Sequence, residues 1–197
     1  MKPPTLGNSH KGFLLLDKKL LSKIRRVKNW PKKGVLFYDL NSTISSNTSF
    51  NYIIDCLSYE CRVLCVNRGI QYNKLKIVGI ESRGFIWASA VASNLRCGFV
   101  PIRKEGKIAD SQVQNITNVR SEYSSQKYVL PKGCIKKNDA VIVIDDVLAT
   151  GQTALGAVNM LMWGEANVIG ACFILGIKKL KGHSVMRGIP MIRLADV

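Results

Sequence analysis

Long apolar runs and a secretory leader are both missing from this sequence of 197 residues. A membrane-spanning helix needs about 20 consecutive apolar residues, and no segment approaches that length. Residues 1–11 carry lysine, proline, glycine and histidine without a sustained apolar core. We therefore expect a cytoplasmic protein that has no membrane partner.

Histidine and metal-type cysteine spacing are also scarce. The two histidines, His10 and His183, lie far apart, and the six cysteines form no Cys-x-x-Cys pair. This pattern argues against a zinc site and against a disulfide framework. We expect reduced cysteines that behave mainly as small buried apolar residues. No Ser-His or Cys-His arrangement indicates a covalent nucleophile.

Acidic residues are few, at 13 against 29 lysines and arginines, which gives a formal net charge of +16. The basic residues cluster at positions 18–33, 103–107 and 178–187. Such a surplus suits nonspecific nucleic-acid binding, a polyanionic small substrate or simple solubility. No aromatic set of the kind found in RNA-binding modules accompanies the charge, so charge alone does not choose among these.

Hydrophobic periodicity predicts alternating helices and strands within one domain over residues 1–197. Apolar residues at helical spacing predict a basic N-terminal helix that ends before Pro31, within an extension of residues 1–30. They also predict a helix over residues 49–66. Short β-rich runs predict strands at 75–80, 99–102, 141–144, 168–175 and 191–194, with helices at about 84–95 and 152–163.

Residues 106–138 are polar and show little periodicity. A stretch of this length inside a compact domain is usually a functional lid, a hairpin or a disordered segment. We interpret it as a mobile flap over the functional site.

The sequence shows its chemistry most plainly at residues 141–153, which read VIVIDDVLATGQT. Four apolar β-formers predict a strand buried on both faces of a parallel sheet, and two carboxylates follow at its carboxyl end. The next turn places backbone N–H groups at a helix N-terminus, where anions bind. Hydroxyl, carboxylate and amide groups together suit a sugar phosphate.

This stretch resembles the phosphoribosyl-pyrophosphate motif of the type I phosphoribosyltransferases. Three further segments are similar to the adenine phosphoribosyltransferases in particular: residues 34–37 (GVLF), 79–85 (GIESRGF) and 101–107 (PIRKEGK). The resemblance runs in the same order from about Trp30 to the C-terminus. It implies an α/β fold with a central, mostly parallel sheet flanked by helices, and a flexible flap over the active site.

The resemblance also implies roles for individual residues on the phosphoribosyl pyrophosphate side. Asp145 and Asp146 would hold the ribose hydroxyls, directly or through water bound to Mg²⁺ that the substrate carries, with no direct protein ligand to the metal. Arg83 would contact pyrophosphate, and Arg103 would reach the site of a neighbouring subunit in a homodimer. Further contacts would come from Ala149, Thr150, Gly151, Gln152, Thr153, Lys104 and Lys107.

On the base side, Phe37 would stack on adenine while backbone groups around Leu36 and Tyr38 read its edge. Glu122 would handle a purine proton, and Tyr123 would close over the pyrophosphate. The implied reaction converts adenine and phosphoribosyl pyrophosphate to AMP and pyrophosphate in purine salvage. Its transition state has oxocarbenium character and needs a neutralised leaving group and exclusion of water.

Four departures from the family pattern leave alternatives open. Gln152 replaces a glycine of the phosphate loop, and Tyr38 stands where many members have arginine. Residues 41–43 lack the usual proline nearby, and Ala109 replaces another proline. Another purine is therefore an alternative substrate. A nucleic-acid-binding regulator on the same fold is a second alternative, although we do not expect a nucleic-acid partner. A P-loop hydrolase is a poor third, because its signature is absent.

Overall fold

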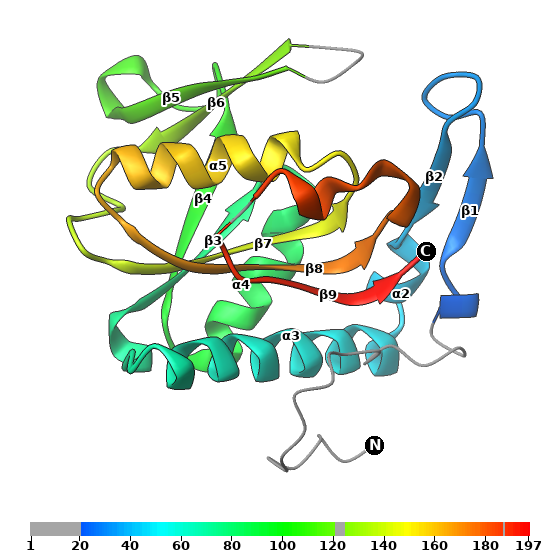
Figure 1. Cartoon of the computed structure of the whole chain (residues 1–197), viewed down its shortest axis with the longest axis horizontal. Helices are drawn as coiled ribbons and strands as arrows, with labels where there is room; N and C mark the ends of the chain where they lie inside the picture. Colours follow the sequence, from blue (N-terminus) through cyan, green and yellow to red (C-terminus); the bar gives the residue numbers. More distant parts are fainter. Residues whose placement is uncertain (1–20, 121–124, 187) are drawn as a thin grey trace.

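A seven-stranded sheet with helices on both faces forms the centre of the computed structural model, which describes residues 21–120, 125–186 and 188–197. The strands lie in the order β5-β6-β4-β3-β7-β8-β9. The five strands from β4 to β9 are parallel to their neighbours, while β5 and β6 extend one edge in antiparallel fashion. Figure 1 shows this sheet with α5 on one side and α3 and α4 on the other. The predicted fold class is confirmed.

The described strands and helices have the following bounds: β1 Arg25–Lys28, β2 Leu36–Asp39, α2 Asn41–Ile44, α3 Asn47–Asn67, β3 Leu75–Ile80, α4 Arg83–Leu95, β4 Gly98–Lys104, β5 Val113–Arg120, β6 Ser125–Pro131, β7 Ala140–Leu148, α5 Gln152–Trp163, β8 Asn167–Gly176 and β9 Met191–Asp196. Short 3₁₀ turns lie at η1 Tyr72–Lys74, η2 Asp110–Gln112, η3 Lys178–Leu180 and η4 Gly182–Ser184.

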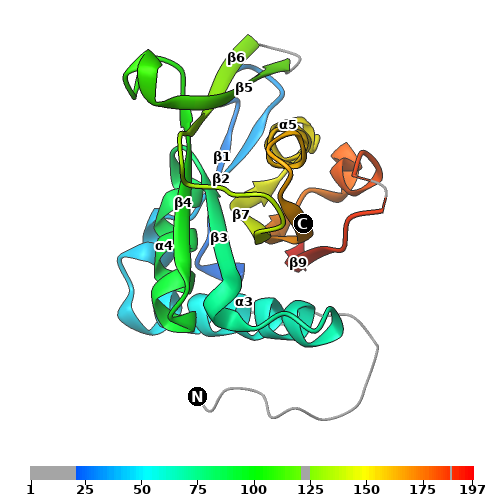
Figure 2. The same cartoon turned by 90° about the vertical axis from the view of Figure 1, so that its left-hand side faces the viewer.

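The sheet divides the apolar core into two layers, because successive side chains of a strand point to opposite faces. Ile142 and Ile144 of β7 pack with α3 and α4, whereas Val141 and Val143 pack with α5. All four side chains are fully buried. Figure 2 shows α4 and α5 on opposite sides of the strands. This burial explains why the strand reads as a continuous apolar run.

Most predicted elements occur where the sequence placed them. The helix predicted at 49–66 is α3, and Gly69, just after it, has a positive φ of 64°. The strand predicted at 75–80 is β3, with the same bounds. The central strand is longer than predicted, because β7 runs through Asp145 and Asp146 to Leu148 and pairs with β8 along that length.

The N-terminal helix prediction is wrong for residues 25–28, and its first part, residues 1–20, lies outside the described residues. Residues 25–28 form β1, which pairs antiparallel with β2. The turn between them uses Asn29 and Gly34, both at positive φ, and the Gly34 amide donates to the Asn29 side chain at 2.9 Å. These turn residues are a hairpin signal that the helical spacing of Leu20, Ile24 and Val27 concealed.

Within the predicted flap, residues 113–131 form the β5–β6 hairpin apart from its tip, residues 121–124, which lies outside the described residues. Val119 and Thr117 of β5 lie against Gly156 of α5. A hairpin was one of the three structures that the sequence left open for this segment. Whether it moves as a flap stays a prediction.

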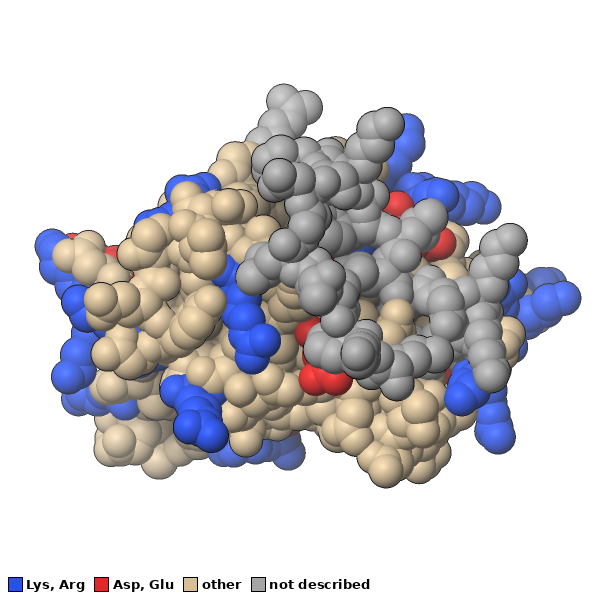
Figure 3. All heavy atoms as spheres, turned by 90° about the horizontal axis from the view of Figure 1, so that it is seen from below, with Lys and Arg blue, Asp and Glu red and all other residues tan. Residues whose placement is uncertain are grey.

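All six cysteines carry free thiols, as predicted, and four of them are buried: Cys56, Cys61, Cys65 and Cys172. Within the described parts of the chain, no helix is long and apolar enough to cross a bilayer. On the face shown in Figure 3, the described lysines and arginines lie in several separate groups. They do not form a continuous basic stripe there.

One acidic side chain is buried inside the apolar layers, away from the carboxyl ends of the strands. Glu60 of α3 is 0% exposed, and neither of its carboxylate oxygens has a hydrogen-bond partner among the described residues. Burial raises the pKa of Glu60 to about 7. Because the folded pKa lies above the unfolded value of 4.5, the folded state binds more protons between these limits. Its contribution to stability is complete below pH 4.5 and is lost as the pH rises through 7.

We therefore predict that Glu60→Gln raises the free energy of unfolding at pH 8 by about 1–3 kcal/mol and changes it little at pH 5. Urea unfolding at both pH values measures this difference. Glu165→Gln is the control, because Glu165 forms an exposed ion pair with Lys137, and it should shift stability by less than about 1 kcal/mol. An unaltered pH dependence in Glu60→Gln would contradict the prediction.

Candidate active site

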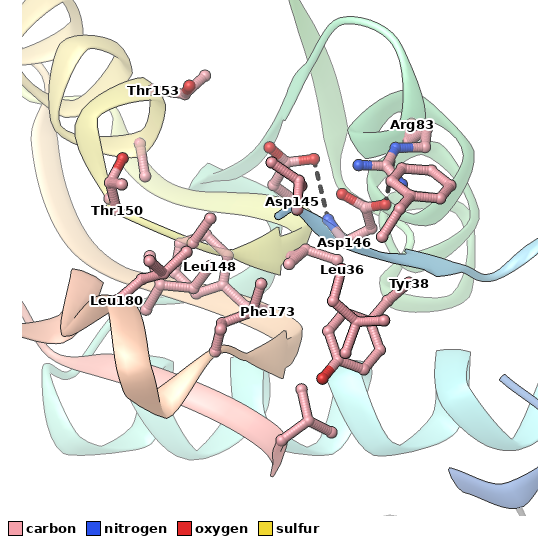
Figure 4. Close-up of a pocket in the computed structure, with 18 of the residues that line it drawn as sticks. Leu36, Tyr38, Arg83, Asp145, Asp146, Leu148, Thr150, Thr153, Phe173 and Leu180 are labelled. Atoms are coloured by element: carbon pink, nitrogen blue, oxygen red, sulfur yellow. Dashed lines mark hydrogen bonds and ion pairs between the residues drawn. The ribbon is translucent and has the colours of Figure 1, made fainter. Parts of the chain in front are cut away.

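A cavity of about 770 Å³ opens at the carboxyl ends of the parallel strands. Its walls come from β2, the turn after β3, the end of β7, the first turn of α5 and the segment that follows β8. This is the place where open parallel sheets bind ligands. Figure 4 shows the acidic residues and Arg83 on one side, the two threonines on another, and apolar side chains between them.

The acidic side consists of two adjacent carboxylates, one of which forms an ion pair with Arg83. Asp146 is 3% exposed and pairs with Arg83 Nε at 2.9 Å. Asp145 Oδ1 accepts a hydrogen bond of 2.9 Å from the Asp146 amide (Figure 4). Burial raises the pKa of both carboxyl groups; the neighbouring charge of Asp146 raises that of Asp145 further, and Arg83 opposes the rise. Arg83 thus keeps negative charge available in a site that otherwise disfavours it.

Arg83 makes a second contact and has one hydrogen-bond donor without a partner. Its Cζ atom lies 5.0 Å from the centre of the Phe37 ring, so that β2 and the start of α4 meet at this side chain. Arg83 Nη1 is buried and has no hydrogen-bond partner within the described structure. A buried guanidinium with a free N–H group is prepared to bind an oxyanion.

The opposite side is the turn between β7 and α5. The helix begins after Gly151, which has a positive φ of 80°, and no side chain caps its first turn. The amides at the start of α5 lack a side-chain partner and face the cavity with Thr150 and Thr153. Uncapped amides at a helix N-terminus can bind anions, and we call this turn, residues 149–153, the phosphate loop.

The phosphate loop is held from behind by a second glycine. A β-carbon on Gly182 would overlap the Ala149 carbonyl oxygen and lie 2.9 Å from the Gly151 nitrogen. A β-carbon on Gly151 would lie 2.6 Å from the Gly182 carbonyl oxygen. The two backbones therefore touch directly, and the segment after β8 supports the loop. Residues 178–187 were noted in the sequence only for their charge.

Apolar side chains line the floor between these polar groups. Leu148 and Phe173 are buried, and Leu180 is 43% exposed at the cavity wall. Leu36 and Phe37 of β2 also line the cavity. Tyr38 also lines it but is only 9% exposed and packs in the core, so its side chain is largely structural. A flat apolar ligand group fits this region.

Sequence reasoning missed several polar residues that line the cavity, namely Glu81, Ser82, Tyr128 and Lys179. Glu81 Oε2 accepts a hydrogen bond of 2.9 Å from the Lys104 amide and lies 3.6 Å from Arg103 Nε. Tyr128 of β6 pairs with Lys104 in the sheet, and burial, Asp145 and Glu81 raise its pKa. Glu81 belongs to the quoted GIESRGF segment, so the signal was present but unused. Tyr128 carried no signal.

The predicted site residues divide into three groups. Those that line the cavity are Leu36, Phe37, Tyr38, Arg83, Asp145, Asp146, Ala149, Thr150, Gly151 and Thr153. Those that do not line it are Gln152, Arg103, Lys104 and Lys107; Gln152 and Lys107 are exposed. Glu122 and Tyr123 lie outside the described residues.

Comparison with known families matches residues 52–187 to the phosphoribosyl transferase domain. A protein of Helicobacter pylori named adenine phosphoribosyltransferase is 40% identical over 173 residues, which cover 87% of this chain and 91% of that protein. One of Brachyspira hyodysenteriae with the same name is 34% identical and covers 85% and 93% of the two chains.

Solved structures agree with this match. Adenine phosphoribosyltransferase from Thermoanaerobacter pseudethanolicus superposes with a TM-score of 0.81 at 26% identity, covering 91% of this chain and 99% of that chain. The enzyme from Saccharomyces cerevisiae, solved with an imino-altritol bisphosphate and adenine, gives a TM-score of 0.79 at 29% identity, with 90% and 97% covered.

Contact between Gly182 and the phosphate loop yields a prediction. Gly182→Ala should displace the loop and weaken binding of a phosphate-bearing ligand by about 10-fold or more, because the loop amides lose their alignment. Calorimetric titration measures the binding. Gly98→Ala is the control, because the nearest atom to its β-carbon would belong to the flexible Lys76 side chain, at 3.3 Å, and the nearest backbone atom would lie at an ordinary contact distance of 3.9 Å. Unchanged binding in Gly182→Ala would show that the loop tolerates the overlap.

Proposed function

We infer that this chain, which belongs to the phosphoribosyl transferase family and within it to the adenine phosphoribosyltransferases, converts adenine and phosphoribosyl pyrophosphate to AMP and pyrophosphate in purine salvage. The observation that carries this function is the single cavity in which an uncapped helix start, a carboxylate pair and Arg83 surround an apolar floor. These groups match a phosphate, a ribose, a pyrophosphate and a base.

At the phosphate end, we propose that the 5-phosphate binds the amides that begin α5, with the hydroxyls of Thr150 and Thr153. The uncapped first turn and the helix dipole support this placement. Gln152 points its exposed side chain elsewhere, but its backbone amide is still available. Replacement of the family's glycine therefore leaves the backbone donors in place.

At the sugar, we propose that Asp145 and Asp146 accept hydrogen bonds from the ribose hydroxyls. Positive charge develops on the ring as pyrophosphate leaves, and two carboxylates in a buried site stabilise that charge. Arg83 binds the leaving pyrophosphate through the nitrogen that has no partner. Adenine N9 then forms the new bond to the anomeric carbon as the bond to pyrophosphate breaks, and the purine gives up one proton, which Glu122 would take up. No protein nucleophile takes part.

We place adenine on the apolar floor, between Phe37 and Leu36 on one side and Leu148, Phe173 and Leu180 on the other. The support is the apolar character of the side chains that line these walls. Arg83 lies over the Phe37 ring in this structure. Stacking of the base on that ring therefore requires either that Arg83 and the base contact opposite faces of the ring or that Arg83 turns toward pyrophosphate.

We propose Mg²⁺ as the cofactor, carried by the substrate. Among the described residues, no group of three or more histidine, cysteine or acidic side chains forms a metal cage. Mg²⁺ typically keeps several waters and binds one or two carboxylates together with substrate phosphates. Asp145 and Asp146 fit that role through bound water. The ion would neutralise the leaving group.

Several finer assignments remain proposals. We propose a homodimer in which Arg103 reaches the active site of the neighbouring subunit. The Arg103 side chain is partly exposed and lies 3.6 Å from Glu81, a loose contact that supports this.

We also propose that Glu122 and Tyr123 act from a closing hairpin, with Lys104 and Lys107 adding charge near the pyrophosphate. A cytoplasmic location fits the six free thiols.

AMP formation from adenine and phosphoribosyl pyrophosphate tests the function. We predict that Asp146→Asn lowers the rate by about 100-fold or more, because it removes a buried charge beside the developing cation. Asp55→Asn makes the same chemical change on the exposed surface of α3 and should leave the rate unaltered. Thermal unfolding confirms that both variants are folded. An undiminished rate in Asp146→Asn contradicts the ribose-binding role.

Two further measurements separate the alternatives. Competition by hypoxanthine and guanine shows whether another purine is the better substrate, which bears on Tyr38. Strongly salt-dependent RNA or DNA binding without AMP formation would favour a nucleic-acid-binding regulator. We expect neither result.

A further inference from the structure

A second, smaller cavity lies on the other side of the phosphate loop. Its volume is about 250 Å³, and we call it the rear pocket. It is lined by Leu148, Gly176, Ile177, Lys178, Lys181, Gly182, His183, Arg193 and Asp196. Only Leu148 and Ile177 also line the substrate cavity. The proposed function assigns no role to the rear pocket.

Cations dominate the rear pocket. Lys178, Lys181 and Arg193 each carry a positive charge, and Asp196 is the single acid. Arg193 neutralises Asp196 through contacts of 2.6 Å from Nε and 3.3 Å from Nη2. A guanidinium has five N–H donors, so Arg193 keeps donors beyond those that Asp196 uses. The remaining charge of the two lysines favours an anion, and the His183 ring adds a polar group to the wall.

Backbone hydrogen bonds fix the walls of the rear pocket. The Lys178 amide donates to the Val197 carbonyl oxygen at 3.0 Å, and the Val197 amide donates to Gly176 at 2.8 Å. The Ile177 amide donates to Leu148 at 2.9 Å. Groups that are already fixed lose little entropy when a ligand binds. The backbone of the pocket is therefore in place before any ligand arrives, while the exposed side chains of Lys178 and Lys181 order on binding.

Size and lining identify the chemical class of the ligand. A volume of about 250 Å³ is roughly a third of the substrate cavity. The wall contains two aliphatic side chains and no Phe, Tyr or Trp ring on which a base could stack. Clustered lysine and arginine donors suit a compact oxyanion. A nucleotide does not meet these conditions, whereas phosphate and pyrophosphate do.

We propose that the rear pocket is a second anion site that binds a free oxyanion of the phosphate class, either inorganic phosphate or pyrophosphate. Gly182 belongs to its wall and also touches the backbone of Ala149 and Gly151. The second site thus borders the phosphate loop from outside the substrate cavity. Binding there does not depend on catalysis.

The test is calorimetric titration of the AMP-saturated protein with inorganic phosphate and, separately, with pyrophosphate at low salt. AMP occupies the sugar-phosphate and base positions of the substrate cavity. Without added Mg²⁺, so that the reverse reaction does not contribute heat, we expect one phosphate-binding event per chain, weakened about 10-fold or more in Lys178→Gln/Lys181→Gln because two charge-assisted contacts are lost. Pyrophosphate should show the same event beside a separate one at Arg83 in the substrate cavity. Whichever anion binds more tightly to this site is identified as its ligand.

Two control variants show where on the protein the anion binds. Lys74→Gln/Lys132→Gln removes the same charge from exposed positions and should bind like wild type. Arg83→Gln disables the pyrophosphate side of the substrate cavity and should leave the rear-pocket event intact. Lys178→Gln alone serves if the double variant unfolds, because Lys181 has a positive φ of 51° and Lys178 does not depend on that conformation.

Two outcomes would overturn the proposal: unchanged affinity in the lysine variants, or loss of the event in Arg83→Gln, which would place it in the substrate cavity. Assays of AMP formation on the same wild-type preparation test the proposed function separately. If the wild-type protein forms no AMP but binds the anion, and the lysine variants lose that binding, the second anion site stands and the proposed enzymatic function is refuted.

Discussion

Burial of β7 on both faces is the constraint on which the rest of the structure depends. Its apolar side chains fill two core layers at once, so the strand can carry polar groups only where the layers end. Asp145 and Asp146 occupy that end, and the chain must then turn into α5. The position of the acidic pair and that of the phosphate loop are therefore set by the same packing. Neither can shift along the strand without exposing apolar side chains or burying further charge.

The acidic pair illustrates how the site balances opposing electrostatic effects. Two adjacent carboxylates with little exposure disfavour ionisation, and burial raises the pKa of each. Arg83 offsets this with one ion pair through Nε, while its Nη1 atom is buried and lacks a hydrogen-bond partner. A ligand that brings both hydroxyl donors and an oxyanion satisfies the acidic and the basic groups together. One substrate thus supplies the hydrogen-bond and charge partners that these polar groups lack in the free protein.

The sequence predicted the central sheet and its carboxyl-end site well, because buried parallel strands and helix starts leave local patterns. The predicted strand at 75–80 matched β3 residue for residue. Contacts between distant segments left no such pattern. Glu81 meets the Lys104 amide only because β3 and β4 are neighbours in the sheet, and Gly182 meets Gly151 only through the fold. The helix predicted at residues 25–28 failed for a similar reason. Pairing with β2 satisfies the backbone there, and this tertiary contact outweighed local periodicity.

The direct contact between Gly182 and the phosphate loop has a consequence for protein engineering. Residues 141–153 look like a self-contained cassette, yet the shape of the loop is set partly by a glycine about thirty positions downstream. Transplanting the cassette into another parallel sheet would carry over the amides and carboxylates without their support. A functional graft must include the segment after β8 as a second piece, with its glycine in register against the loop. The transferable unit of phosphate recognition in this protein is therefore a discontinuous one.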